Sequence, residues 1–220
     1  MPTLFSYCIP YDAGAAPNPY WGVCTLAICK PKIRLAAQVG DWVVGTGSVG
    51  SPIGDVSGRV VYAMQVTRKM EMWEYDRWTK ECLPEKVPDW HHPDHRRRLG
   101  DSLYDFSTHP PRQRQGVHDK GNRARDLSGK FVLLSTHFFY FGDQPKPLPP
   151  RLLSIVKQGR GHRSTANAPY IDRFLAWIHA LGIRANTLIG KPQIELFADD
   201  DSVAKCAAPS TGEGTETHAC

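Results

Sequence analysis

The residues that could do chemistry are spread over several short motifs. The first motif is VGDWVVGTGS, which begins at Val39. Its Gly-Asp pair predicts a tight turn in which the carboxylate of Asp41 accepts backbone N–H bonds, and the glycines around Thr46 and Ser48 offer N–H groups to a small anion or ligand. The motif lacks the Gly-Lys-Ser/Thr ending of a phosphate loop and the spacing of a dinucleotide fingerprint. An ordinary strand flanked by glycine turns is the alternative.

A second group of motifs combines arginine with aromatic side chains. HRRRLGDSLYD begins at His95, STHFFYFG at Ser135 and GRGHRS at Gly159. Guanidinium groups bind phosphate or carboxylate and also stack on aromatic rings. The run of aromatic side chains from Phe138 to Phe141 cannot face a single core, because side chains alternate along a strand, so one pair is predicted to line a pocket that stacks a base. A strand buried on both faces is the alternative.

Metal signatures are weaker. Three histidines lie between residues 91 and 95, next to Asp94. Pro93 interrupts the helix that a spacing of four residues between two of these histidines would need, so we expect no zinc there. Cys24 and Cys29 lack the second pair of a cysteine metal site. The sequence therefore predicts neither a metal nor a cofactor.

The charge of the chain is concentrated in its middle. The 220 residues carry a net charge of +5, but residues 1–90 hold 9 basic and 9 acidic side chains, residues 91–163 hold 14 and 6, and residues 164–220 hold 4 and 7. A focused basic segment beside aromatic residues is typical of a protein that binds nucleotides or a phosphate backbone. A solvated loop with ordinary surface charge is the alternative.

Composition excludes several classes of protein. With 41% hydrophobic and 10% aromatic residues, the chain can bury a core and is not disordered throughout. Its longest apolar runs have the length of a strand, far below the roughly 20 residues that a bilayer requires, so no membrane span is expected. The amino terminus shows no secretory signal and the six cysteines have no repeated spacing, which predicts reduced thiols and a cytoplasmic location.

The predicted elements indicate an α+β domain. We expect strands at residues 4–9, 23–28, 42–44, 59–67, 130–135 and 137–141, and helices at residues 32–38, 71–82, 152–156 and 169–181. A regular alternation of strands and helices is missing, which favours a small, strongly bent β-barrel with flanking helices. One domain is predicted over residues 1–197, with a long basic insert near 83–129 that is functional or disordered, followed by a disordered acidic tail at 198–220.

In combination, these segments resemble a known family. TLFSYCIPYDAGAAPNPYWGVCTLAICKPKIR, GDWVVGTGS, VVYAMQV, HRRRLGDSLYD, VLLSTHFFYFG and GRGHRS occur in this order. The chain is similar over roughly residues 3–180 to the second of the nucleotide-modification-associated domain families, which come from phage and bacterial gene neighbourhoods concerned with modified DNA bases. The resemblance implies a role with nucleotides or modified nucleic acid, beside enzymes that modify bases.

The Gly-Asp-Trp turn and the Tyr-Ala-Met strand also resemble the base-binding barrels of the PUA, ASCH and EVE type. In such barrels a flipped or modified base lies in an aromatic-lined cleft. This second resemblance is an analogy of fold, and fold alone does not determine function. The insert at residues 83–129 departs from a minimal barrel of this kind.

The first functional hypothesis is a module that binds a nucleotide or a modified base of a nucleic acid. Guanidinium groups would hold the phosphates, and aromatic, amide and hydroxyl side chains would stack on the base or contact its edges. The predicted phosphate-binding residues are Arg96, Arg97, Arg98, Arg160 and Arg163. The predicted base-binding residues are Asn18, Trp21, Trp42, Thr46, Ser48, Tyr62, Tyr104, Ser135, Phe139 and Tyr140.

The alternative is an enzyme that acts on a nucleotide or a DNA base. Asp41 or Asp101 would serve as acid or base, assisted by His137 or His162. A thiol nucleophile at Cys24 with one of these histidines as base is a weaker version, since a buried, unreactive thiol is the simpler interpretation. A third option is a protein that binds RNA or DNA without specificity. The sequence leaves open which base is bound.

Overall fold

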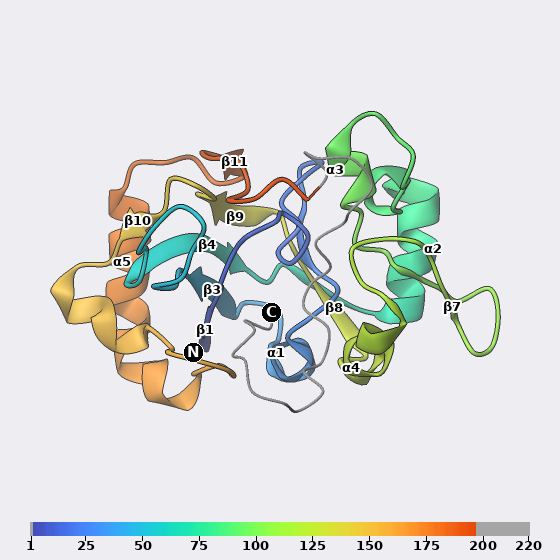
Figure 1. Cartoon of the computed structure of the whole chain (residues 1–220). Helices are drawn as coiled ribbons and strands as arrows, with labels where there is room; N and C mark the ends of the chain where they lie inside the picture. The colour runs from blue at the N-terminus through green and yellow to red at the C-terminus, as the bar shows by residue number, and fades with distance from the viewer. Residues whose placement is uncertain (1, 197–220) are drawn as a thin grey trace, which may run out of the picture.

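Two pairs of consecutive strands form a bent ribbon that joins the two larger sheets (Figure 1). The computed structural model describes residues 2–196. In one sheet β4 (Arg59–Gln65) pairs antiparallel with β9 (His137–Tyr140), and in the next β5 (Arg68–Glu71) pairs antiparallel with β8 (Phe131–Ser135). Only Val66, Thr67 and Thr136 separate these strands along the chain, and Thr67 N donates to Leu134 O over 2.9 Å. The ribbon therefore continues through the bend.

The remaining strands extend the ribbon on both sides. β3 (Trp42–Thr46) lies antiparallel to β4, and β1 (Leu4–Cys8) lies parallel to β3. β10 (Lys146–Pro147) pairs with β4, β11 (Thr187–Leu188) with β9, and β2 (Cys24–Leu26) with β8. A separate two-stranded sheet consists of β6 (Tyr104–Asp105) and β7 (Arg112–Gln113).

The barrel predicted from the sequence does not close within residues 2–196, whereas the mixture of helices and strands is confirmed. β1 and β2 each end their own sheet and do not pair with one another. A loop residue covers each of these edges instead, through the bridges Ser6↔Arg163 on β1 and Asn18↔Thr25 on β2. Because each edge already has a hydrogen-bonding partner, the gap between β1 and β2 stays open.

Buried side chains fill both faces of the ribbon. Phe138 and Tyr140 of β9 lie in a core enclosed by the bent sheets, while Phe139 and Phe141 lie in a second core on the outer face. The aromatic run thus belongs to a strand that is buried on both sides, which was the alternative to a base-stacking pair. The outer core also receives α5 (Ile171–Ala180), whose Phe174 ring lies 5.9 Å from the ring of Trp42.

The helices follow the local sequence signals. α5 buries Ile171, Phe174 and Ile178 and ends before Gly182, which has a left-handed φ of 65°. α2 (Met72–Cys82) begins with a capping box between Glu71 and Glu74. The shorter helices are α1 (Pro31–Ala36), α3 (His95–Arg98), α4 (Arg123–Ser128) and the 3₁₀ segments Pro84–Lys86, Lys120–Asn122, Pro150–Ile155 and Thr165–Tyr170. None of the helices described in residues 2–196 is both long and apolar enough to cross a membrane.

The insert at residues 83–129 contains α3, α4 and the β6–β7 sheet and lies at the end of the molecule opposite α5 (Figure 1). The fully buried ammonium of Lys86 fixes it to the loop before β2 by donating to Asn18 O (2.9 Å), Asn18 Oδ1 (2.7 Å), Val23 O (2.8 Å) and Thr25 Oγ1 (3.0 Å). The predicted acidic tail at 198–220 lies outside the described residues.

Asp101 is the acidic member of the same buried network, and burial raises its pKa while the charge of Lys86 and the bonds from Thr25 and Tyr75 oppose that rise. It accepts hydrogen bonds from Thr25 Oγ1 (2.5 Å) and Tyr75 Oη (2.6 Å). Burial lowers the pKa of Lys86 to about 8, and the charge of Asp101 limits this fall. Lys86 therefore keeps its proton near neutral pH and balances a carboxylate that has left water.

Substitution Lys86→Met should be strongly destabilising. Methionine fills a similar volume but leaves four acceptor sites and the Asp101 carboxylate without the cation, which costs about 3–5 kcal/mol in unfolding free energy. Lys80→Met is the matched control, because Lys80 pairs with Asp76 and Asp105 at 2.9 Å but is 40% exposed, so its loss should cost at most about 1 kcal/mol. Urea unfolding measures both variants, and equal losses would contradict the role of Lys86.

Candidate functional site

A sharp turn after β2 presents the thiol of Cys29. Cys29 and Lys30 both have left-handed backbone conformations, with φ of 58° and 41°, directly before Pro31 begins α1. Such conformations are costly for residues other than glycine and persist only where the surroundings enforce them. Here Cys29 N donates to Asp126 Oδ1 over 2.9 Å and Arg34 Nε donates to Cys29 O over 2.8 Å. The insert and α1 together hold the turn.

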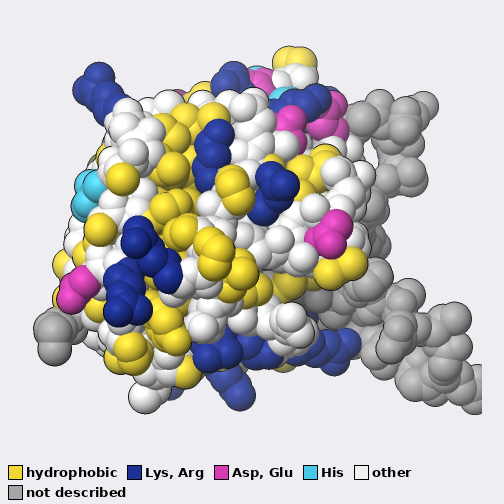
Figure 2. Space-filling model, turned by 90° about the vertical axis from the view of Figure 1, so that its left-hand side faces the viewer, with side chains coloured by type: hydrophobic (Ala, Val, Ile, Leu, Met, Phe, Trp, Pro, Cys, Tyr) yellow, Lys and Arg dark blue, Asp and Glu magenta, His cyan; other side chains and the backbone are white. Residues whose placement is uncertain are grey.

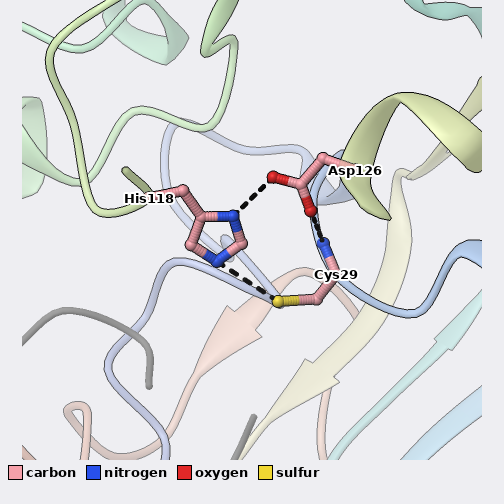
Figure 3. Close-up of side chains that lie close together, drawn as sticks. All are labelled: Cys29, His118 and Asp126. Atoms are coloured by element: carbon pink, nitrogen blue, oxygen red, sulfur yellow. Dashed lines mark hydrogen bonds and ion pairs between the residues drawn. The ribbon is translucent and has the colours of Figure 1, made fainter. Parts of the chain in front are cut away.

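The thiol, an imidazole and a carboxylate form a chain of contacts at this turn (Figure 3). Cys29 Sγ lies 3.4 Å from His118 Nε2, and His118 Nδ1 lies 2.5 Å from Asp126 Oδ2. Tyr104 Oη donates to the same carboxylate oxygen over 3.0 Å. Nucleophile, base and orienting carboxylate occur in this order in thiol and serine hydrolases. We call Cys29, His118 and Asp126 the thiol relay.

Electrostatics within the thiol relay favour a protonated ring. Burial lowers the pKa of His118, but the negative charges of Cys29 and Asp126 outweigh it and raise that pKa to about 10. Burial likewise raises the pKa of Asp126, yet the hydrogen bond and charge of His118 outweigh burial and leave that pKa below its usual value. At neutral pH the imidazole therefore holds a proton beside an ionised carboxylate, ready to be given to a reacting group.

The same three side chains are also the types that bind zinc. Their ligand atoms all lie within 4.8 Å of one another. However, the two ring nitrogens of His118 face different partners, Nδ1 toward Asp126 and Nε2 toward Cys29. A single metal ion that bound the imidazole together with both Cys29 and Asp126 would have to break the hydrogen bond between His118 and Asp126. The arrangement therefore has the geometry of a proton relay.

A pocket opens beside the thiol relay, between the ends of β1 and β2. Its enclosed space is small, about 30 Å³ for the centre of a water-sized sphere, and Cys29, only 3% exposed, forms part of its wall. The other lining residues are Tyr7, Ile9, Pro10, Tyr11, Ala13, Ala15, Ala16 and Lys30. The Lys30 ammonium lies 4.5 Å from the centre of the Tyr7 ring. Small alanines, two tyrosines and one cation give the pocket a mostly apolar, aromatic wall with a single positive group.

Asp12 lies in the loop that forms one wall of the pocket. Its buried carboxylate accepts hydrogen bonds from Tyr140 Oη and from Gly14 N, the latter over 3.0 Å. Burial raises the pKa of Asp12 to about 6 despite these two donors. Tyr7 and Tyr62 share a further hydrogen bond of 2.9 Å between their hydroxyls. The pocket thus rests on a buried, hydrogen-bonded layer of tyrosines.

Asp12→Asn should change how stability depends on pH. An acid whose pKa is raised on folding contributes stability that is complete below its unfolded pKa of 3.8 and is lost as the pH rises through about 6. Relative to the asparagine variant, the wild type should therefore lose about 2 kcal/mol of unfolding free energy between pH 4 and pH 7. Urea unfolding at several pH values tests this, and parallel pH profiles would contradict it.

Comparison with known families decides the classification. The family model described as nucleotide modification associated domain 2 matches residues 1–199. The chain belongs to this family. The comparisons with curated proteins and with solved structures give no significant match. All residues of the pocket and the thiol relay lie inside the part that matches the nucleotide modification associated domain.

The acid–base residues predicted from the sequence have separate positions in this nucleotide modification associated domain. Asp41 accepts Thr3 N (2.7 Å) and Gln38 N (2.8 Å), which confirms the predicted turn. Asp101 belongs to the Lys86 network. The His137 ring lies 5.6 Å from that of Trp42, and the His162 ring lies 5.8 Å from that of Phe5. Within residues 2–196, neither carboxylate bonds to either histidine.

The predicted binding residues divide into three groups. None of them lines the pocket, but the first group bonds to residues of the pocket loops or of the thiol relay. These are Ser48, which donates to Pro10 O over 3.0 Å, Tyr62, which bonds to Tyr7, Tyr104, which donates to Asp126, and Tyr140, which donates to Asp12. Those inside the fold are Asn18, which donates to Leu99 O, Trp42 and Phe139 in the outer core, Thr46, which donates to Tyr7 O, and Ser135, which donates to His137 O. Those nearer the surface are Trp21, Arg96, Arg97, Arg98, Arg160 and Arg163.

Sequence reasoning missed the thiol relay. Cys29 was considered only as a metal ligand beside Cys24, and His118 and Asp126 were two among many polar residues of the insert. The relay residues are separated by 89 and 97 positions from Cys29, so no local spacing marks them. The one local signal is Cys-Lys-Pro after a strand, a point at which the chain must turn before a helix.

Proposed function

We propose that this protein recognises a nucleotide, or a base of a nucleic acid, in the pocket between β1 and β2, and that cations around the pocket mouth hold the phosphates. Membership of the nucleotide modification associated domain 2 family ties the chain to nucleic-acid modification. The observation that supports nucleotide or base recognition best is a strongly cationic border beside an aromatic pocket. A partner enzyme that modifies the base stays a prediction from the sequence.

None of the described residues that line the pocket is acidic. Residues 2–11, 13–40 and 144–171 contain neither aspartate nor glutamate. Asp12, which lies between two of these segments, is buried and bonded to Tyr140. A charge distribution of this kind attracts anions from solution and binds phosphate groups through several cations at once.

Five cations lie on the pocket lining, on α1 and on the segment 157–163 that bonds to β1, and we call them the cationic rim. Within the described residues none of them forms an ion pair. The cationic rim consists of Lys30, Lys32, Lys157, Arg160 and Arg163. In Figure 2, Lys and Arg side chains follow the lower border of the face that carries α5, the side on which Figure 1 places α1.

Contacts around β1 place the rim residues near one another. Arg163 exchanges two backbone hydrogen bonds with Ser6, of 2.9 and 2.8 Å, along the outer edge of β1. Burial raises the pKa of the Cys8 thiol at the end of this strand, and the nearby charges of Lys30 and Lys157 partly offset that rise. Burial lowers the pKa of His162, and the charge of Lys32 lowers it further. The segment 157–163 and α1 therefore flank the same strand.

The basic residues of the insert are engaged differently. Residues 91–129 hold 8 basic and 5 acidic side chains, and several of them pair. Arg114 lies 2.6 Å from Asp76, and Arg96 lies 2.7 Å from Asp94 with its guanidinium 4.9 Å from the centre of the Trp21 ring. Because their charge is already balanced within the protein, these arginines are less available to phosphates than the cationic rim is.

The pocket supplies the complementary contacts to a base. Tyr11 is the partly exposed aromatic side chain of its lining, and a base stacked on such a ring contributes about 1–3 kcal/mol. The Tyr7 ring is fully buried beneath Lys30 and supports the wall from behind. The polar parts of the lining, above all Lys30, can contact the edge of the ring. Phosphates on the rim would thus position the ligand and the pocket would select the base.

Binding of a fluorescent single-stranded oligonucleotide tests this proposal. The dissociation constant should rise steeply with salt concentration. The double variant Lys157→Gln/Arg160→Gln should weaken binding about tenfold and reduce the slope of log Kd against log salt concentration by about 1–2, because two phosphate contacts are lost. Arg77→Gln/Lys120→Gln removes two exposed cations away from the rim and should leave binding unchanged. A flat salt titration, or equal effects of the two double variants, would overturn the proposal.

A further inference from the structure

Cys29 has surroundings that base recognition alone does not require. We infer that Cys29 is the nucleophile of a thiol-dependent acyl transfer, which removes or moves an acyl group linked through nitrogen to a base held in the pocket. The identity of this substrate rests on the proposed function. The assignment of Cys29 as nucleophile rests separately on the thiol relay and on the turn that carries it.

The thiol relay supplies the groups that such a reaction needs, at suitable distances. The 3.4 Å between Cys29 Sγ and His118 Nε2 permits proton exchange between sulfur and ring, and the 2.5 Å between His118 Nδ1 and Asp126 fixes the orientation of the ring. Tyr104 Oη and Cys29 N each donate to Asp126, so both carboxylate oxygens are held. Arg34 adds a buried hydrogen bond of 2.5 Å to the backbone carbonyl of Asp126.

The turn offers a position for the carbonyl oxygen of the substrate. In hydrolases with a nucleophile elbow, the backbone N–H after the nucleophile polarises this oxygen. Here that residue is Lys30, which lines the pocket together with Cys29. Within residues 2–196 its backbone N–H donates no hydrogen bond, while the carbonyl of the same residue accepts from Ile33 N and Arg34 N. We assign this N–H to the developing oxyanion.

The reaction balances with water as the only co-reactant. The Cys29 thiolate attacks the carbonyl carbon, a C–S bond forms, and the electron pair of the C=O bond moves to oxygen. When the carbonyl re-forms, the C–N bond breaks and the nitrogen leaves on the base with the proton of His118 Nε2. Water then adds to the thioester while His118 accepts one of its protons, and the C–S bond breaks to release a carboxylic acid and restore the thiolate. The acid gives its remaining proton to solvent and leaves as the carboxylate.

The thiol relay favours acyl transfer over the other covalent reactions of thiols with nucleobases. Addition of a thiolate to a pyrimidine ring carbon has no leaving group at that step, so it does not require an imidazole backed by a carboxylate. Expulsion of an amine does require a proton donor. The raised pKa of His118 keeps such a proton in place at neutral pH. The geometry therefore favours a substrate with an amide-type bond.

Acylation with p-nitrophenyl acetate tests the nucleophile directly, using the full chain. Peptide mass spectrometry should find an acetyl group on Cys29 at about pH 6.5 and at least about tenfold faster there than on Cys82, an exposed thiol of the same molecule. His118→Gln should reduce the rate at Cys29 to that of Cys82. A rate at Cys29 no greater than at Cys82, or an unchanged rate in His118→Gln, would overturn the inference.

A second measurement covers the case in which His118→Gln does not fold. In the wild type, alkylation of Cys29 by iodoacetamide should vary little between about pH 6 and 8, because the imidazolium of His118 lies 3.4 Å from its sulfur and favours the thiolate. The exposed thiol of Cys82 in the same molecule is the reference. Parallel pH profiles for the two thiols would count against the relay even without the variant.

An oligonucleotide containing N4-acetylcytosine tests the substrate class and separates the two proposals. The wild type should release acetate from it, and Cys29→Ser should bind it with unchanged salt dependence but release none. Binding without acetylation of Cys29 would leave the proposed function standing and defeat this inference. Acetylation of Cys29 by p-nitrophenyl acetate without oligonucleotide binding would support the nucleophile and defeat the proposed function.

Discussion

The buried ammonium of Lys86 is the contact on which the arrangement of this molecule depends. It reaches from the start of the insert into the loop before β2, where four oxygen acceptors surround it, and Asp101 balances its charge from further along the insert. A buried charge held in this way adds little net stability but is very costly to leave without its partners, so it selects one docked position of the insert over all others. Every residue that the insert contributes to the site depends on this position.

The thiol relay shows what that docking accomplishes. β2 and α1 bring Cys29 to the edge of the open gap, and the insert brings His118 and Asp126 to it from the other side. The left-handed turn at Cys29 and Lys30 is unfavourable by itself and is held by Asp126 and Arg34. Structure and chemistry thus use the same hydrogen bonds, since Asp126 fixes both the turn and the ring of His118.

Elements with strong local patterns could be predicted from the sequence. The alternating strand at 59–67 and the amphipathic helix at 169–181 lie close to β4 and α5, and the turn at Asp41 has the predicted backbone bonds. That the insert at residues 83–129 is ordered could not be predicted in this way, because its order comes from the distant contacts of Lys86 and not from periodicity. The thiol relay was missed for the same reason. The resemblance to the nucleotide-modification-associated family was confirmed, whereas a closed barrel was not found in the described residues.

The bridge between Ser6 and Arg163 has a consequence for the order in which the protein acquires its site. β1 is among the first segments to be synthesised, yet the partner of its outer edge lies more than 150 positions later in the chain. Contacts of such separation carry a large loop-closure entropy and form late in folding. A growing chain can therefore contain Cys29, His118 and Asp126 while the pocket wall still lacks its neighbour, so the thiol gains its final surroundings only when almost the whole described domain has been made.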